Sequence, residues 1–124
     1  MFNIGLGRIE LELDKERYQP GSEVKGRVVL KLKEPVPARG VRVEFFGVKK
    51  PLEEDDIGED VNEVRVDLEL GEKNYTSKSY DFKLRIPLDL ELENEDGEPT
   101  KWYVKATLDK PGLDLNNELE VEIT

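Results

Sequence analysis

The stretch DKERYQPGSEVKGRVVLKL, residues 14–32, encodes a turn and then a strand. Pro20 holds its own φ at about −65° and Gly21 readily takes a positive φ, so the two residues fit the central positions of a type II turn. In residues 23–33, apolar side chains alternate with charged ones, which is typical of a β-strand with one buried and one solvent-facing side. Such a strand needs a second layer of structure to cover its apolar side.

The same alternation recurs along most of the chain, whereas no segment of ten or more residues shows the 3.6-residue period of a helix. Clusters of Pro and Gly separate the alternating segments. The predicted strands are 9–13, 23–33, 41–48, 63–70, 80–86, 102–109 and 119–123. We therefore predict one all-β domain over residues 1–124, an immunoglobulin-like antiparallel β-sandwich of about seven strands. A closed barrel is the alternative that periodicity leaves open.

The charges on the outward sides indicate which strands pair. Strand 9–13 presents glutamates, whereas strand 23–33 presents lysines and an arginine. Each direct pair of opposite charges across neighbouring strands contributes about 0.2–1 kcal/mol. We therefore expect these two strands to form a hairpin, with Pro20-Gly21 as the connecting turn.

The composition argues against several classes of function. The 124 residues include no His and no Cys, which removes the commonest general base, the thiolate nucleophile and the usual metal ligands. The formal net charge of −10 repels phosphate backbones and anionic membranes, so neither nucleic-acid binding nor membrane insertion is expected. We predict a protein that is not an enzyme, with no catalytic residue, cofactor site or metal site.

Two further expectations concern the source and the location of the protein. The first residues lack a basic region followed by an apolar one, so we expect no signal peptide and a cytoplasmic protein. Abundant Glu and Lys, a single Met and no Cys are typical of thermophilic proteins, although six asparagines argue the other way.

Two acidic loops, 53–60 and 90–98, offer an alternative function. Clustered carboxylates can bind Ca²⁺ when a loop folds their oxygens inward. Neither loop has the ligand spacing of an EF-hand, and solvated, mutually repelling charges explain both stretches as well. The alternative hypothesis is therefore a β-sandwich that binds a metal ion or another ligand through these two loops.

A few apolar side chains fall on the charged side of their strands. If strands 41–48 and 102–109 are neighbours, Phe46 and Tyr103 can meet on an outer surface, where exposed aromatic clusters often mark interfaces. The other reading is that a loop, or the N-terminal segment with Phe2 and Ile4, covers them. The candidate partner surface consists of Val29, Phe46, Val48 and Tyr103.

Three segments resemble the arrestin-like superfamily. One resembles the opening of an arrestin N-terminal domain, with a tyrosine before Pro-Gly, an internal glycine in the next strand, and then RGV. The likeness extends, in order, over essentially the whole chain, and the Trp-bearing strand is similar to that of bacterial and archaeal sporulation-control proteins. The residues that carry it are Tyr18, Pro20, Gly21, Gly26, Arg39, Gly40, Val41, Tyr80, Phe82, Pro87, Trp102, Tyr103, Val104, Lys105, Ala106, Leu108 and Asp109.

The resemblance implies an adaptor or scaffold that binds proteins through strand edges and concave sheet faces, with no enzymatic activity. Arrestins carry two such domains, whereas this sequence contains one. A two-fold contact between copies could stand in for the second domain, so a homo-oligomer is also expected. The basic phosphate-sensing element and the polar core of arrestins have no recognisable counterpart here, so phosphoreceptor binding is not implied.

Overall fold

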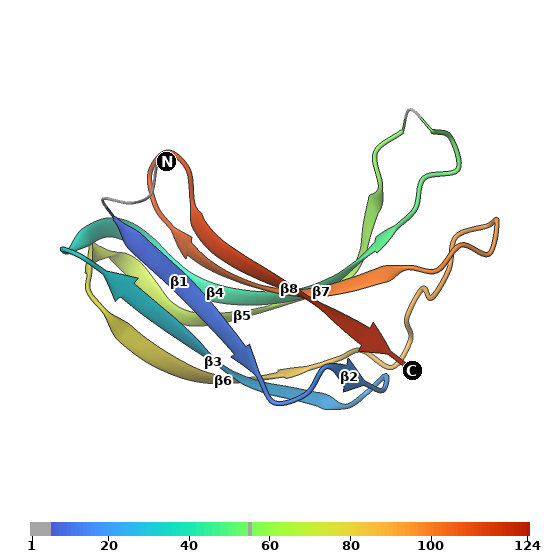
Figure 1. Ribbon diagram of the computed structural model, residues 1–124, viewed down its shortest axis with the longest axis horizontal. Coiled ribbons are helices and arrows are strands. Elements are labelled where there is room, and N and C mark those ends of the chain that lie inside the picture. The colour runs from blue at the N-terminus through green and yellow to red at the C-terminus, as the bar shows by residue number, and fades with distance from the viewer. Residues whose placement is uncertain (1–5, 55) are drawn as a thin grey trace.

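The computed structural model describes residues 6–54 and 56–124, which form strands and connections with no helix (Figure 1). No part of this described chain, therefore, is a helix long and apolar enough to cross a membrane. The strands are β1 (Gly7–Leu13), β2 (Arg17–Tyr18), β3 (Glu23–Leu32), β4 (Val36–Lys49), β5 (Glu59–Tyr75), β6 (Lys78–Arg85), β7 (Lys101–Asp109) and β8 (Leu115–Ile123).

The strands form two sheets that pack face to face, as predicted for a β-sandwich. One sheet has three strands in the order β1-β3-β6, and the other has five in the order β2-β8-β7-β4-β5. All pairs are antiparallel except the short β2–β8 pair, which is parallel and departs from the expected all-antiparallel arrangement. Figure 1 shows that the five-stranded sheet is curved. Its convex face packs on the three-stranded sheet, and the face turned away from that sheet is concave.

The predicted pairing of the first two long strands is confirmed. β1 runs antiparallel to β3, with Glu12 opposite Arg27. Glu10 also reaches the Lys31 ammonium at 3.2 Å, so the acidic side of one strand lies beside the basic side of the other. The charge pattern was therefore sufficient to identify these neighbours.

The turn is also confirmed, but it does not close the hairpin. The Ser22 amide donates to the Gln19 carbonyl at 3.1 Å, and Gly21 has a φ of 82°, as a type II turn requires. Before this turn, however, the chain crosses to the other sheet and forms β2, where Tyr18 is buried and its hydroxyl donates to Asp14 Oδ1 at 2.7 Å. Burial of Tyr18 thus explains why the connection between β1 and β3 is longer than a simple hairpin turn.

The core lies between the two sheets and is aliphatic, with a central aromatic stack. The rings of Phe45 and Trp102 lie parallel, with their centroids 5.4 Å apart. Gly47 leaves room for this stack, because a Cβ there would lie 2.5 Å from the Trp102 ring. Fully buried residues from both sheets surround it, among them Val24, Val28, Leu30, Val41, Val43, Ile86, Val104 and Leu108.

Gly26, in the middle of β3, lets neighbouring strands approach closely. It lies opposite Leu13 on β1 and Phe82 on β6. A Cβ at this position would lie 2.4 Å from the Glu12 carbonyl oxygen and 2.6 Å from the Phe82 ring. The ring occupies the space that a side chain would take, so the glycine is a packing requirement.

Polar contacts join the sheets at their two margins. On one side, the Asn117 amide on β8 donates to the Ile9 carbonyl on β1 at 3.1 Å. On the other, the Tyr80 hydroxyl on β6 donates to Glu69 Oε1 on β5 at 2.5 Å, and Lys73 and Lys78 form ion pairs with the same carboxylate. The hydrogen bonds from Lys73 and Tyr80 lower the pKa of Glu69 from 4.5 to about 2.

Two asparagines fix the long connection between β6 and β7. Asn62, with a φ of 55°, donates to the Asp89 carbonyl and accepts from the Glu91 amide, both at 2.9 Å. The buried Asn94 accepts from two amides of its own loop and donates to the Lys50 carbonyl at 2.8 Å. The acidic stretch 90–98 is therefore held against the β4–β5 end of the five-stranded sheet.

We predict that Gly26→Ala lowers the free energy of unfolding by about 2–3 kcal/mol, because the added methyl group meets backbone that cannot move without separating β1 from β3. Gly97→Ala is the control: Gly97 has a φ of 79° but no atom within 4 Å of its Cβ position, so it measures backbone strain alone, about 1 kcal/mol. Urea denaturation measures both values. Equal losses would mean that the close approach at Gly26 does not matter.

We predict that Glu69→Gln lowers stability by about 1–2 kcal/mol at pH 7, because it removes a charge that accepts hydrogen bonds. The carboxylate in the folded protein has a pKa of about 2, below its ordinary 4.5. Its stabilising effect is therefore complete above the ordinary pKa and is lost as the pH falls from 4.5 toward 2. Denaturant titrations across this range should show the difference between wild type and variant shrinking as the pH falls; a constant difference would contradict the assignment.

Candidate functional site

The concave face of the five-stranded sheet carries the candidate site. Since side chains alternate along a strand, the residues between the core positions of β4 and β7 point to this face. Phe46 lies directly opposite Tyr103 in the β4–β7 register. Their rings stack with centroids 5.6 Å apart and an interplanar angle of 29°, and both side chains are half-buried. The structure thus brings together the two aromatic residues that the sequence analysis expected to meet.

A groove of about 470 Å³ begins at Tyr103 and extends toward the β4–β5 loop. Val48 and Tyr103 line it together with Pro51, Pro99 and Lys101. Beside the groove, the β4–β5 loop rises from the concave face (Figure 1) and exposes Leu52 and Ile57, which are 51% and 94% accessible. The groove is therefore lined by apolar residues together with charged ones, and Leu52 and Ile57 lie on the loop beside it.

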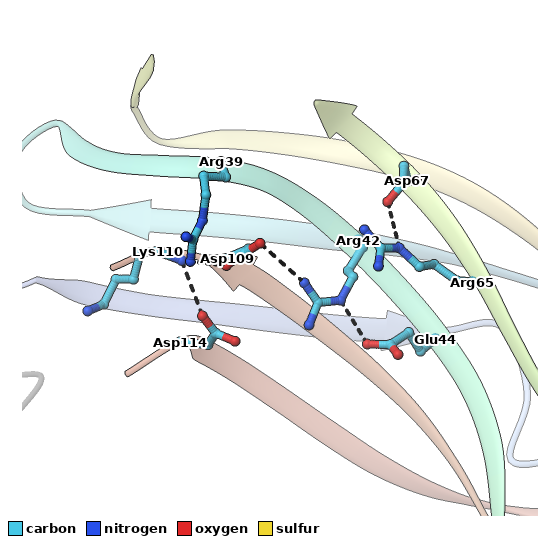
Figure 2. A network of polar contacts seen from close by, with 8 residues as sticks. All are labelled: Arg39, Arg42, Glu44, Arg65, Asp67, Asp109, Lys110 and Asp114. Carbon is cyan, nitrogen blue, oxygen red and sulfur yellow. Dashed lines mark hydrogen bonds and ion pairs between the residues drawn. The ribbon is translucent and has the colours of Figure 1, made fainter. Parts of the chain in front are cut away.

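The face becomes polar farther along the same strands. Figure 2 shows Arg42 at the centre of a network in which its Nε donates to Glu44 Oε1 at 2.9 Å. Its guanidinium also lies 3.8 Å from Asp109, which in turn accepts from Arg39 at 2.8 Å. These charges are paired with one another, so they give this part of the face a fixed shape.

The Tyr103 hydroxyl remains protonated at physiological pH. Partial burial raises its pKa, and the negative charges of Glu120 and Glu118 on the neighbouring strand raise it further. A neutral phenol can donate a hydrogen bond to a carbonyl or a carboxylate. Tyr103 therefore presents both an aromatic ring and a donor to whatever occupies the face.

The remaining sequence-based candidates are not all part of this face. Val29 is half-buried on β3, on the outward side of the three-stranded sheet, so the structure separates it from the other three candidates. Phe2 and Ile4, considered as a cover for the aromatic pair, lie outside the described residues. Leu52 and Ile57 were missed, although their signal was present: they are isolated apolar residues in an otherwise acidic stretch.

The acidic loops do not assemble ligands in the part of the chain that the structure describes. Within residues 6–54 and 56–124, no three acidic side chains lie close enough together to hold a metal ion. Asp55 lies outside the described residues. In the loop 53–60, the described carboxylates are solvent-exposed, and loop 90–98 is organised by the Asn94 amide.

Comparisons with known proteins add information on the fold. The sequence matches no protein-family model and no curated protein. Among solved structures, the sporulation control protein Spo0M from Bacillus subtilis superposes with a TM-score of 0.72 and 19% identity, over 97% of this chain and 50% of that one. A Paenibacillus cycloisomaltooligosaccharide glucanotransferase, complexed with cycloisomaltoheptaose, superposes with a TM-score of 0.54 and 13% identity, over 95% of this chain and 14% of that one.

The chain has an arrestin-like fold. This confirms the resemblance drawn from the Pro-Gly turn, the internal glycine of β3 and the Trp-bearing β7. The chain spans half the length of Spo0M.

We predict that Phe46→Ala costs about 1–2 kcal/mol of stability, the value of a cross-strand aromatic contact and a half-buried ring. Phe45→Ala is the matched variant, one residue away on the core side, and should cost about 3–5 kcal/mol. Chemical denaturation distinguishes the two. A loss at Phe46 as large as that at Phe45 would place its ring in the core and remove it from the candidate site.

Proposed function

We propose that this protein is a non-enzymatic adaptor or scaffold domain that binds extended segments of other proteins and associates with itself. The observation that carries the proposal is the stacked Phe46–Tyr103 pair, which lies half-exposed on a concave sheet face beside a groove lined by apolar and charged side chains. Aromatic residues on a rigid surface are the side chains that most often anchor protein interfaces.

The residues around the groove favour a partner segment with apolar and acidic side chains. Lys49, Lys50 and Lys101 all border the groove. Lys49 and Lys50 have acidic neighbours at 3.2 and 3.8 Å, Glu91 and Glu98 respectively, which are exposed to solvent. The Lys50–Glu98 pair is exposed at both ends and therefore weak, so an acidic group of a partner can replace Glu98 at little cost. The Lys49 side chain is more buried and keeps its pair with Glu91.

The composition supports a binding role over catalysis. With no His and no Cys, the chain lacks the commonest general base and the thiolate nucleophile, and its serines have no histidine to activate them. With a net charge of −10, it is suited to protein partners and disfavours nucleic acid. A cytoplasmic location and a thermophilic source remain predictions; a melting temperature in the ordinary mesophile range would argue against the latter.

A displayed random-peptide library tests the proposal. We expect the wild-type protein to enrich peptides that combine apolar and acidic residues, and we expect Phe46→Ser and Tyr103→Ser to lose at least about tenfold in affinity for them, because each removes half of the aromatic anchor. Fluorescence anisotropy with the enriched peptides measures the loss. Val29→Ser, on the other sheet, is the control and should bind as the wild type does.

Three results would count against the proposal. The first is a failure to enrich any peptide, and the second is binding that is indifferent to Phe46 and Tyr103. The third is saturable Ca²⁺ binding with a rise in melting temperature, which would favour the metal-binding alternative at the acidic loops.

A further inference from the structure

The outer edge of β5 is a long sheet edge that no other strand of the described chain covers. β5 is the last strand of the five-stranded sheet, and among the described residues it pairs only with β4. It extends over Glu59–Tyr75 without a proline. An edge strand of this kind presents free backbone N–H and C=O groups that a further strand can pair with.

The apolar side of β5 is also incompletely covered. Val64, Val66 and Leu68 pack against the core, yet all three are only half-buried. The three-stranded sheet ends at β6, and β6 meets β5 near Glu69. A strand added beyond β5 would therefore shield apolar surface as well as complete hydrogen bonds.

Irregularities limit the part of the edge that can pair. Residues 64–67 follow β4 in unbroken register, from Val64 opposite Phe45 to Asp67 opposite Arg42. On either side the register shifts, at the left-handed Asn62 and at Leu68, which has no partner on β4. Bulges of this type limit edge pairing, so the usable segment, which extends from Val64 to Leu68, is short and any association through it is weak and dependent on concentration.

The charges in this segment are self-complementary. Arg65 and Asp67 lie on the concave side, where their side chains contact each other at 2.9 Å (Figure 2) and are 54% and 36% exposed. If two copies pair antiparallel about Val66, each Arg65 lies opposite the Asp67 of the other copy. On the inner side, Val66 then lies opposite Val66, and Val64 opposite Leu68.

The neighbouring register is disfavoured. Centring the pair on Arg65 would place the two arginines opposite each other and Glu63 opposite Asp67. Like charges directly opposite in a sheet are destabilising. This register would also place Val64 opposite Val66 and Leu68 opposite Asn62, so Leu68 would have no apolar neighbour.

We propose that two copies of this chain associate through β5, antiparallel and centred on Val66, into one continuous ten-stranded sheet. This rests on the self-association included in the proposed function and assigns it to one edge and one register. The two-fold axis is perpendicular to the sheet, so both concave faces lie on the same side of the dimer and form a single wider surface.

The outer edges of β6 and β1 fit a second copy less well. β6 has a similar charge pattern, with Asp81 and Lys83 on either side of Phe82. Its inward side chains, Tyr80 included, are already buried, so pairing there would shield little apolar surface. On the edge of β1, the Ile9 carbonyl is occupied by the side chain of Asn117.

Two single charge reversals test the inference. In the proposed dimer, position 65 of each copy faces position 67 of the other. In the Arg65→Asp variant two aspartates would therefore face each other, and in the Asp67→Arg variant two arginines would. We expect the wild type to show a concentration-dependent monomer–dimer equilibrium in analytical ultracentrifugation, and each variant to dimerise at least about tenfold more weakly. In an equimolar mixture of the two variants, both contacts become Asp–Arg, so the mixture should dimerise as the wild type does.

Controls separate this result from misfolding and from other edges. Each reversal removes an exposed ion pair and also places a like charge opposite β4, an aspartate at position 65 opposite Glu44 or an arginine at position 67 opposite Arg42. We therefore expect each variant to melt somewhat below the wild type, and melting curves should show that both are folded at the temperature of the dimerisation experiment. Asp81→Lys on β6 should leave dimerisation unchanged. Because the chain has no cysteine, Val66→Cys provides an independent readout: mild oxidation should give a disulfide-linked dimer, whereas Arg65→Cys should not.

Several outcomes would overturn the inference: a wild type that stays monomeric at high concentration, a dimer insensitive to both reversals, a mixture that does not recover, or cross-linking through Arg65→Cys in place of Val66→Cys. Peptide binding at Phe46 and Tyr103 is measured separately on the monomer. A failure to dimerise therefore does not contradict the proposed adaptor function, and a failure to bind peptides does not contradict the proposed dimer.

Discussion

The structure depends on the packing of a narrow sheet against a wide one. Three strands cover the inner face of five, and the centre of the contact is dry and closely packed around the Phe45–Trp102 stack. At the margins, where the three-stranded sheet ends, polar groups join the two sheets. Asn117 donates to the β1 backbone on one side, and Glu69 accepts from the Tyr80 hydroxyl on the other. The half-buried apolar residues of β5 are a direct consequence of this difference in width. The inner face therefore determines where the molecule still has surface available for association.

The outward face obeys a different requirement, because each of its residues must be compatible with water or with a partner. Over most of β4 and β7, paired charges such as Arg42 with Glu44 and Asp109 meet this requirement. At one end the pattern changes to Phe46, Val48 and Tyr103, beside a groove and an exposed loop. Exposed aromatic surface lowers solubility unless a partner covers it. The change from charged to aromatic residues along the same strands is thus the feature that distinguishes this end of the face from an ordinary solvated surface.

Local patterns in the sequence were sufficient for the strands, the type II turn, the β1–β3 pairing and the meeting of Phe46 with Tyr103, because alternation and turn chemistry act over a few residues. The features that these patterns did not predict depend on contacts between segments that are distant in the sequence. The β2 excursion exists because Tyr18 is buried beside β8, and nothing near residue 18 specifies that partner. Strict alternation along residues 63–70 places Glu69 with the other charged residues on the outer side. Its side chain instead turns inward, because Leu68 has no partner on β4. Val29 was grouped with the aromatic pair since the sequence does not state which sheet β3 joins.

If the domain binds proteins as we propose, it recognises its targets by shape, backbone pairing and modest charge, and each of these contributes little alone. A half-exposed aromatic pair and one groove offer limited buried area, which typically gives weak binding. Joining two copies through β5 would place two such faces side by side, and a target that engages both gains affinity through effective concentration with no new type of contact. The open edge of β5 and the aromatic face would then act together. Association through the incompletely covered edge would raise the affinity of an aromatic face that binds weakly on its own. Because the edge segment is short, this gain would vary with the concentration of the protein.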